Sequence, residues 1–292
     1  MKRLFIIFFS MILLAACQKD VVVDEGSAST LTYSLSTGVS FEVKGTVSDP
    51  AAVTDPAAVL GGASKINVLW YGVYHKKSDG TYGYMSDMSA FVEVTDPNSI
   101  QVPITLITGQ EYELVFVAQH RILSANDDHT YMYTISDDAV MSRNPSAAVT
   151  SGEQLDVFVF VDKVGPIVGN ITKSITLERP VAQINIATSA GASAGSVYGP
   201  GISHIDVEFS NVPQSYDIRT STYSGTTSLS FENLPISAAL IKVGNIDYTS
   251  LTTLYILGGN RVEMTISSDS NQKTITNIAT APNYKTNVVG NI

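Results

Sequence analysis

The stretch KINVLWYGVYHKKSDGTYGYM, residues 65–85, contains the clearest secondary-structure signal in the chain. Its first run, Ile66 to Tyr74, has two alternating faces that are both apolar, which predicts a central strand covered on both sides. Ser78-Asp79-Gly80 follows this run, and a second aromatic run begins directly after it. An Asp-Gly pair between two such runs is a strong signal for a β-hairpin.

Apolar and β-branched runs of the same kind follow one another along the rest of the chain. They are VPITLITGQEYELVFVAQH (residues 102–120), LDVFVFVDKV (155–164), SITLERPVAQINIATS (174–189), SHIDVEFSNV (203–212), TSLSFENL (227–234) and LTTLYILGGNRVEMTIS (251–267). Thr108-Gly109 marks a turn, and Gly258-Gly259-Asn260 predicts the tip of another hairpin. Many short strands separated by frequent turns predict an all-β chain built of sandwiches. Short helices are also compatible with Asp137–Ser142, which Asp137-Asp138 would cap, and with Pro235–Lys242.

The N-terminus has the pattern of a secretory signal. Lys2 and Arg3 provide the positive charge, and an apolar stretch runs from Leu4 to Ala16, too short to span a bilayer comfortably. Leu14-Ala15-Ala16-Cys17 resembles the lipobox of bacterial lipoproteins. The resemblance implies cleavage before Cys17, a diacylated thiol and stable anchoring by two or more acyl chains. The alternative is an ordinary signal peptide in which this cysteine is incidental.

Composition narrows the classes of protein further. Cys17 is the only cysteine among 292 residues, so the chain has no intramolecular disulfide and no paired-cysteine metal or redox site. The net charge of −10 disfavours nucleic acid and anionic lipid surfaces as partners. The residues after Cys17, Gln18 to Glu25, resemble the acidic tag that sends some lipoproteins to the outer face of the outer membrane. We therefore expect surface exposure, with a periplasmic location as the alternative.

The interruptions in the strand pattern suggest a domain plan. Residues 1–16 form the signal peptide and residues 17–30 a lipidated tether, and the Ser/Thr/Gly-rich residues 26–38 predict a flexible leader. Gly-Pro and Gly-Asn interruptions near residues 165–170 place the main boundary at about 170–178. We assign an N-terminal β-sandwich domain to residues 31–172 and a C-terminal one to residues 173–292.

No pattern in the sequence predicts an enzyme. Gly191 to Gly195 fits G-x-S-x-G around Ser193, but the following residues cannot begin the helix that a hydrolase nucleophile requires. The four histidines are far apart in the sequence. The oxygen-rich residues Asn126-Asp127-Asp128 lack the spacing of a calcium loop and are more typical of a solvated turn. We predict no catalytic residue, no metal and no cofactor.

The aromatic residues suggest a different kind of site. Trp70, Tyr74 and several neighbours are concentrated in residues 70–91. Most such residues pack in a core or in cross-strand pairs, but exposed ones could stack on sugar rings. Trp70 and Tyr74 are therefore candidate glycan contacts. They support the alternative hypothesis of a glycan-binding surface lipoprotein that serves a polysaccharide-uptake system.

Three further segments follow one another along the chain: VLWYGVYHKKSDG (residues 68–80), LERPVAQINIAT (177–188) and PNYKTNVVGNI (282–292). Together they resemble the fimbrillin-like surface lipoproteins of gut and oral Gram-negative anaerobes, which have such segments in the same order. The resemblance implies two tandem transthyretin-like, Greek-key sandwiches and a structural or adhesive role in a pilus. It also implies assembly with other fimbrial subunits, in which a protease removes an N-terminal strand and a neighbouring subunit's strand replaces it.

The chain departs from this family at two points. Oral fimbrillins are cut after an arginine, but no arginine occurs between Cys17 and Arg121, so Lys44-Gly45 is the candidate cleavage site. The terminal motif is normally followed by a further strand, whereas this sequence stops at Ile292. A second domain without that strand would have an open edge. The sequence leaves shaft, tip and anchor roles open, and it identifies no receptor.

Overall fold

The computed structural model describes residues 27–37, 42–49, 63–124, 129–189, 197–199, 201–243, 245–269 and 271–291. Strands dominate these residues, and the described helices are two short 3-10 turns, η1 (Ser86–Met88) and η2 (Gly152–Leu155). The predicted all-β class is therefore confirmed. Within the described residues, no helix combines the length and the apolar character needed to span a bilayer.

The described strands fall into an earlier and a later group along the chain. The earlier group is β1 (Ala28–Thr37), β2 (Glu42–Asp49), β3 (Val68–Lys76), β4 (Tyr82–Tyr84), β5 (Ala90–Glu93), β6 (Ile100–Ile107), β7 (Tyr112–Gln119), β8 (Arg121–Ile122), β9 (Thr130–Tyr131), β10 (Tyr133–Ile135), β11 (Val140–Arg143), β12 (Val157–Val164) and β13 (Ile171–Leu177). The later group is β14 (Val181–Ser189), β15 (His204–Val212), β16 (Ser215–Asp217), β17 (Thr222–Ser224), β18 (Thr227–Pro235), β19 (Leu240–Val243), β20 (Ile246–Leu257), β21 (Arg261–Ser267), β22 (Gln272–Ala279) and β23 (Tyr284–Gly290).

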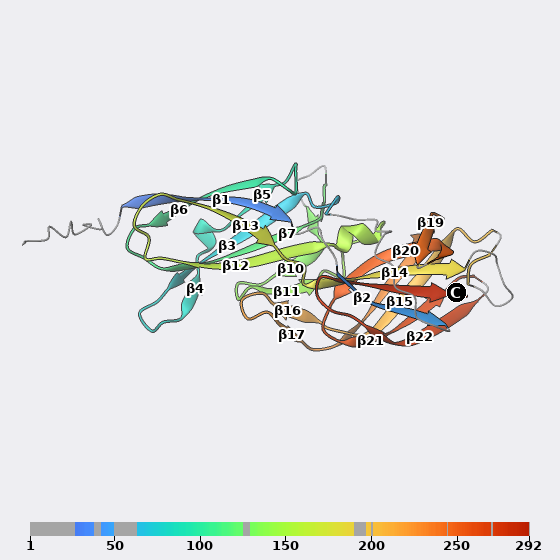
Figure 1. Ribbon diagram of the computed structural model, residues 1–292. Helices are drawn as coiled ribbons and strands as arrows, with labels where there is room; N and C mark the ends of the chain where they lie inside the picture. Colours follow the sequence, from blue (N-terminus) through green and yellow to red (C-terminus); the bar gives the residue numbers. More distant parts are fainter. Residues whose placement is uncertain are drawn as a thin grey trace, which may run out of the picture.

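Two sheets form the first sandwich, which lies at the left of Figure 1. One sheet has the order β13-β1-β6, and the other has the order β12-β7-β3-β4, with β5 also paired to β3. Alternate side chains of β1 and β6 face the core between the sheets, where they meet Leu114 and Phe116 of β7. The opposite face of β7 and β3 is also covered, so the predicted two-sided central strand is confirmed.

A second pair of sheets forms the second sandwich, at the right of Figure 1. Its sheets have the orders β19-β20-β14-β23-β2 and β18-β15-β21-β22. The strands β15 and β21 alternate between buried and exposed residues, as expected for a sheet with one solvated face. Ile186, Leu254, Phe209 and Met264 belong to the core between the two sheets.

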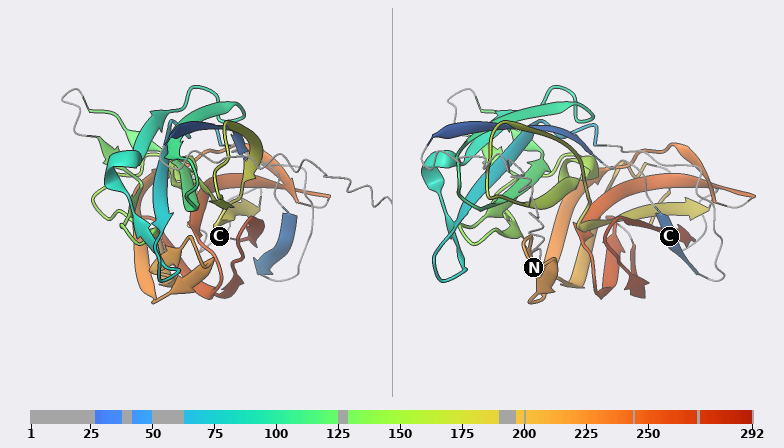
Figure 2. Two further views of the ribbon diagram at one scale, coloured as in Figure 1. Left: turned by 90° about the vertical axis from the view of Figure 1, so that its left-hand side faces the viewer. Right: turned by 60° about the vertical axis from the view of Figure 1, so that its left-hand side comes forward.

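A third sheet joins the two sandwiches, and we call it the linking sheet. Its order is β10-β11-β16-β17, so two strands come from the earlier group and two from the later group. Met141 of β11 lies opposite Tyr216 of β16 across the join. The turn η2 also packs on β20. Figure 2 shows the linking sheet and the second sandwich from two further sides.

The strand β2 belongs to the second sandwich although it comes early in the chain. It runs parallel to β23, the last strand, and Thr46 lies opposite Asn287. In Figure 2 it is the blue strand beside the C-terminal strand. The edge next to β23, which the sequence predicted to be open, is therefore occupied by β2. The first sandwich ends with β13, Ile171–Leu177, and the exact domain boundary stays a prediction.

The flexible leader predicted for residues 26–38 is wrong for Ala28–Thr37, which form β1. The Ser/Thr composition concealed an alternating pattern, because Leu31, Tyr33 and Leu35 all point into the first core with at most 2% exposure. Alternation of this kind is the signal of a strand with one buried face. The composition of the other face gave the misleading impression of a linker.

Two predicted turns connect different sheets, so neither closes a hairpin. Gly109 has a positive φ of 84°, but β6 pairs with β1 while β7 pairs with β3 and β12. Similarly, Gly258–Asn260 leads from β20 in one sheet to β21 in the other. A turn signal marks a chain reversal but does not say which strands pair. The hairpin around Asp79-Gly80 is confirmed, since Tyr74 lies opposite Tyr84.

The two short helices considered in the sequence are absent at those positions in the described chain. Asp137 and Asp138 lie in the turn between β10 and β11, where Ser136 donates its backbone N–H to the carbonyl of Val140. The residues Pro235–Lys242 cover the end of β18, a connection and the start of β19. Pairing of β11 with β16 and of β19 with β20 overrides the weak local preference.

Candidate functional site

The first candidate site is the slot in the first sandwich that β1 fills. The strand lies between β13, to which it is parallel, and β6, to which it is antiparallel, so its backbone is paired along both edges. The side chains of Leu31, Tyr33 and Leu35 fill the core beneath it. The Tyr33 hydroxyl donates a hydrogen bond of 2.6 Å to Asp162 Oδ2. Burial and the neighbouring Asp162 both raise the pKa of Tyr33, so the hydroxyl stays protonated as a donor.

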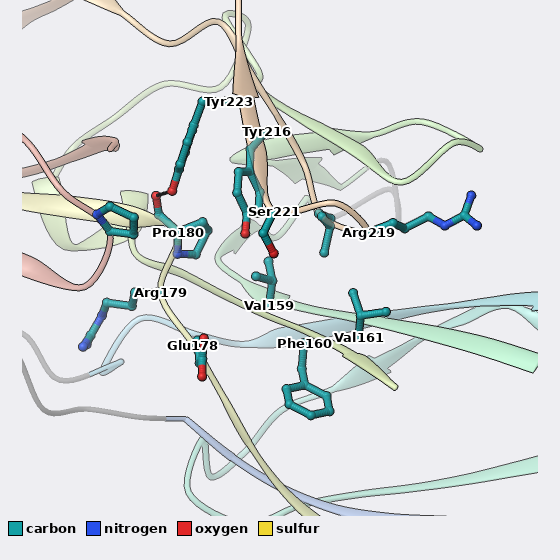
Figure 3. Close-up of a pocket in the computed structure, with 12 residues that line it drawn as sticks. Val159, Phe160, Val161, Glu178, Arg179, Pro180, Tyr216, Arg219, Ser221 and Tyr223 are labelled. Atoms are coloured by element: carbon teal, nitrogen blue, oxygen red, sulfur yellow. Dashed lines mark hydrogen bonds between the residues drawn. The ribbon is translucent and has the colours of Figure 1, made fainter. Parts of the chain in front are cut away.

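The second candidate site is a groove between the two sandwiches, which we call the junction groove. Its volume is about 380 Å³. Its lining residues come from β12, the link between β13 and β14, the β16–β17 region and the loop before β23: Val159, Phe160, Val161, Glu178, Arg179, Pro180, Tyr216, Ile218, Arg219, Ser221, Tyr223 and Pro282. Figure 3 shows Tyr216 extending toward Val159 and Tyr223 extending toward Pro180, while Arg179 and Arg219 extend to opposite sides.

The link Glu178–Pro180 holds one wall of this groove in place. Glu178 and Val159 exchange both backbone hydrogen bonds, at 2.9 and 2.8 Å. The Tyr223 hydroxyl donates a hydrogen bond of 2.6 Å to the carbonyl of Pro180, drawn as a dashed line in Figure 3. Arg179 points away from the groove into the interior. These contacts connect β12, the link and the β16–β17 hairpin into one rigid wall.

Arg179 is buried and paired with Asp156. Its Nε and Nη2 atoms donate hydrogen bonds of 2.8 and 3.0 Å to the two carboxylate oxygens, and both side chains are almost completely inaccessible. The guanidinium also lies over the ring of Phe158, 4.3 Å from its centroid. Burial raises the pKa of Asp156, although Arg179 and backbone N–H groups act in the opposite direction. The pair fixes the point where the chain leaves the first sandwich.

Beyond Val159, the edge of β12 has no strand partner among the described residues. Alternate residues of an antiparallel strand direct their backbone groups to opposite sides. Because Val159 bonds outward to Glu178, Val161 and Lys163 also direct theirs outward, along the junction groove. An unpaired edge beside a groove can accept the backbone of an extended segment.

Two cations lie near this edge and share one buried carboxylate. Glu113 is 2% exposed and forms an ion pair with Arg219 Nε, and Lys163 Nζ lies 3.4 Å from its other oxygen. The Arg219 guanidinium also covers the Tyr74 ring at 4.9 Å from its centroid. A buried carboxylate needs such partners, because it loses its hydration on folding. The cluster therefore anchors the groove to β7.

Two of the segments that resemble fimbrillins meet in the second sandwich, on the buried face of β14 and β23 that points away from the core between its sheets. Asn185 Nδ2, from LERPVAQINIAT, donates a hydrogen bond of 2.8 Å to Oδ1 of Asn287, from PNYKTNVVGNI. Gln183 Nε2 and the Thr253 hydroxyl both donate to Asn185 Oδ1, at 2.7 and 3.0 Å. Buried amides are stable only when paired. This network gives a physical reason for the asparagines in both segments.

Some of the site residues predicted from the sequence lie outside the described residues, and others lie within them. Cys17 lies outside the described residues, as do Ser193 and Asn126-Asp127-Asp128. Lys44 and Gly45 lie in β2, where the register with β23 shifts between Val43 and Gly45. Lipidation and cleavage therefore stay predictions.

The two predicted glycan contacts are both largely buried. Tyr74 is 1% exposed beneath Arg219 and Tyr84, which leaves its ring no face for a sugar. Trp70 is 6% exposed, but it forms part of the lining of a separate cavity. Aromatic clustering alone did not distinguish core residues from surface residues. The exposed member of the set is Phe91, at 48%.

The histidines and carboxylates of the described residues form no group of three or more that could hold a metal. His75 contacts Gln110, His120 contacts the carbonyl of Lys65, and His204 contacts Ser203. The sequence offered no signal for the junction groove, because its lining comes from four separate segments between Val159 and Pro282. Glu178, Arg179, Pro180 and Pro282 lie in the resembling segments and residues 159–161 in a predicted strand, but nothing in the sequence indicated that they meet.

Comparisons with known proteins place the chain beside several distant structures. A "putative adhesin" from Bacteroides thetaiotaomicron has 10% identity and a TM-score of 0.49, over 87% of this chain and 80% of that chain. The fimbrial anchor protein Mfa2 from Porphyromonas gingivalis has 14% identity and a TM-score of 0.43, over 82% and 78%. "Putative polysaccharide binding proteins (DUF1812)" from Bacteroides thetaiotaomicron have 11% identity and a TM-score of 0.47, over 85% and 80%.

At these values the likeness assigns no function, and the proposals below rest on the residues of this chain. None of the curated proteins matches it significantly. One family model, described as "Family of unknown function (DUF6562)", matches residues 30–292. The match covers β1 almost from its start, both sandwiches and the linking sheet, and the chain therefore belongs to the DUF6562 family.

Proposed function

We propose that the protein is a surface lipoprotein of the fimbrillin-like type, a non-catalytic structural or adhesive component of a pilus. Acyl chains on Cys17 attach it to the outer face of the outer membrane. The two sandwiches correspond to two tandem transthyretin-like domains, and the protein assembles with other fimbrial subunits by β-strand exchange. The lipobox supports the attachment, and the place of β1 supports the assembly.

The observation that carries this proposal is that β1 forms a discrete, replaceable part of the first sandwich. It is the first described strand, yet it lies in the middle of a three-stranded sheet. Three of its core side chains, Leu31, Tyr33 and Leu35, are buried in the same slot. Burial of side chains of this size contributes about 1.5–3 kcal/mol each. An empty slot of this kind would bind another alternating strand strongly.

The position of Lys44-Gly45 supports the same mechanism. Cleavage there would separate β1 from the rest of the polypeptide, because β1 ends at Thr37. Release of β1 would expose the edges of β6 and β13 together with the apolar core between the sheets. A strand from a neighbouring subunit could then restore the backbone hydrogen bonds and refill the core. The free edge of β12 offers a second place for an incoming backbone.

The decisive experiment is to isolate the protein from the outer membrane of its own cells. Polymerised subunits give ladders on gels of unheated samples, because an exchanged strand dissociates slowly. N-terminal sequencing should find Gly45 in the ladder, and the intact mass should show a lipid-modified Cys17 in the precursor or anchor form. If unheated samples contain only monomer, a shaft role is excluded, whereas a tip or anchor role remains.

A variant pair tests the cleavage itself. Lys44→Gln should abolish the chain that begins at Gly45 and any ladder that depends on it. Lys65→Gln changes an exposed lysine outside the described strands and serves as the matched control. A ladder that persists unchanged in Lys44→Gln would contradict processing at this bond.

Strand exchange can also be measured with a peptide. A synthetic Ala28–Thr37 peptide should bind chain that has been cut after Lys44 and freed of its own β1. The same peptide with serine at positions 31, 33 and 35 keeps the backbone but loses the core side chains. Equal binding of the two peptides would show that the slot is not the acceptor.

A further inference from the structure

A second cavity, on the face of the first sandwich next to the linking sheet, has the features of a ligand site. We call it the aromatic pocket. Its volume is about 470 Å³, within the usual range for small-molecule sites. The residues that line it are Trp70, Phe91, Gln119, His129, Thr130, Tyr131, Tyr133, Thr134, Ile135, Asn144 and Ser146.

Its aromatic wall is a stacked pair. The rings of Phe91 and Tyr131 have centroids 4.7 Å apart and an interplanar angle of 23°. Phe91 is 48% exposed, although apolar rings of this size are usually buried when they serve only the core. Phe91 lies directly opposite Trp70 in the pairing of β5 with β3. The pocket therefore has the buried indole of Trp70 beside the partly exposed ring pair of Phe91 and Tyr131.

The polar groups of the pocket are amides, hydroxyls and one imidazole. The Asn144 amide donates to the carbonyl of Tyr131 at 2.9 Å and accepts from the backbone of Ser146 at 3.0 Å. The Asn144 side-chain amide can donate and accept further hydrogen bonds beyond these two. His129 Nδ1 accepts a hydrogen bond from the backbone of Ser124, which leaves Nε2 to carry the proton of a neutral ring. These groups can both donate to and accept from ligand hydroxyls.

The pocket differs from the junction groove in its charge. No Asp, Glu, Lys or Arg is among the described residues that line it, whereas the charged residues Glu178 and Arg219 line the groove. An anionic ligand would find no cation there and would meet a chain of net charge −10. An uncharged ligand with an apolar face and many hydroxyls fits the donor set, the acceptor set and the stacked rings.

We propose that the aromatic pocket binds a neutral carbohydrate, with a sugar ring stacked on Phe91 and Tyr131 and its hydroxyls bonded to Asn144 and His129. The apolar C–H face of a pyranose covers an aromatic ring, and the hydroxyls at its rim meet the polar groups. This inference is independent of the proposed assembly role. A pilus subunit and a non-polymerising surface protein could both contain such a pocket.

The mature chain provides an internal reporter for this site. Trp70 is the only tryptophan in the sequence and lines the pocket. We would titrate the chain with uncharged polysaccharides (starch, galactomannan, xyloglucan and yeast mannan) and with polygalacturonate as the anionic probe. At least one neutral polymer should change the Trp70 emission and retard the protein in affinity gels, and polygalacturonate should do neither.

Variants then locate the contact. Phe91→Ala and Tyr131→Ala should each weaken binding about tenfold or more, because aromatic stacking is lost, while Phe91→Tyr should retain it. Phe160→Ala removes a ring from the junction groove and should leave binding unchanged. Circular dichroism verifies that each variant is folded. Absence of response to every neutral polymer, a response to polygalacturonate alone, or binding unaffected by both alanine variants would overturn the proposal.

Discussion

Replacing Arg179 by leucine should destabilise the protein far more than an average substitution. The guanidinium forms two hydrogen bonds with Asp156, and the two side chains are 0% and 3% exposed. Arg179→Leu leaves the Asp156 carboxylate buried without its cation. The leucine fills most of the space, so the expected effect comes mainly from the unpaired charge.

The structure allows an estimate of the size of this effect. Removing one partner of a buried pair typically costs about 3–5 kcal/mol. The contact between the guanidinium and the Phe158 ring is also lost, and desolvated cation–π contacts contribute about 2 kcal/mol. The two effects overlap, so we expect a total loss of about 4 kcal/mol. At about 2–4 °C per kcal/mol, the melting temperature should fall by roughly 8–16 °C.

Urea unfolding of a set of three variants would measure it. Asp156→Asn should also cost several kcal/mol, because Arg179 is then the unpaired charge. The double variant should lose less than the sum of the two, with a coupling energy of about 2 kcal/mol or more. Purely additive losses, or single losses under about 1 kcal/mol, would refute the conclusion that the pair acts as one unit.

The pH dependence of Arg179→Leu has a definite sign. Burial already raises the pKa of Asp156 above its ordinary value of 3.8. Arg179 acts in the opposite direction in the parent protein, so removal of Arg179 raises the pKa of Asp156 further. The folded variant then binds a proton more tightly than the unfolded chain does. Its stability should rise as the pH falls through the folded-state pKa towards 3.8, so its deficit relative to the parent should shrink. A deficit that stays constant from pH 7 to pH 5 would contradict this explanation.

Two further substitutions test other parts of the fold. Asn287→Ala removes the acceptor of the Asn185 amide, which is then left buried without its partner. The free energy of unfolding measured in urea should fall by about 1–3 kcal/mol. A loss near zero would mean that the network contributes little to stability. Gly152→Ala places a methyl group against the carbonyl oxygen of Thr253 and should lower the melting temperature clearly, by the equivalent of about 1–3 kcal/mol. Gly83→Ala is its control, because the added methyl group meets only the flexible end of a lysine, and similar losses in the two would disprove the packing argument.

The sequence was sufficient to predict the fold class and the central hairpin. The run Ile66 to Tyr74 is apolar on both faces, and the structure covers both faces of β3. Local signals of this kind depend on a few neighbouring residues, so they can be detected in a single sequence. The same holds for the alternation of Leu31, Tyr33 and Leu35, which was present but was hidden by the Ser/Thr composition around it.

Pairing partners and sites could not be obtained in this way. Gly258–Asn260 gives the same turn signal whether the flanking strands pair with each other or join different sheets. The aromatic pocket depends on the exposure of Phe91, whereas Tyr74, an aromatic residue of the same region, is buried. Exposure is decided by which sheet covers which face. That information is contained in contacts between residues far apart in the chain.

The linking sheet has a consequence for how the molecule responds to force and heat. Val140 and Ser142 of the earlier strand group lie opposite Asp217 and Ser215 of the later group, so each sandwich supplies an edge that the other completes. Unfolding of either sandwich therefore breaks backbone hydrogen bonds of the other. Calorimetry should then record a single cooperative transition. A force applied across the two sandwiches should be transmitted through the linking sheet without a hinge between them.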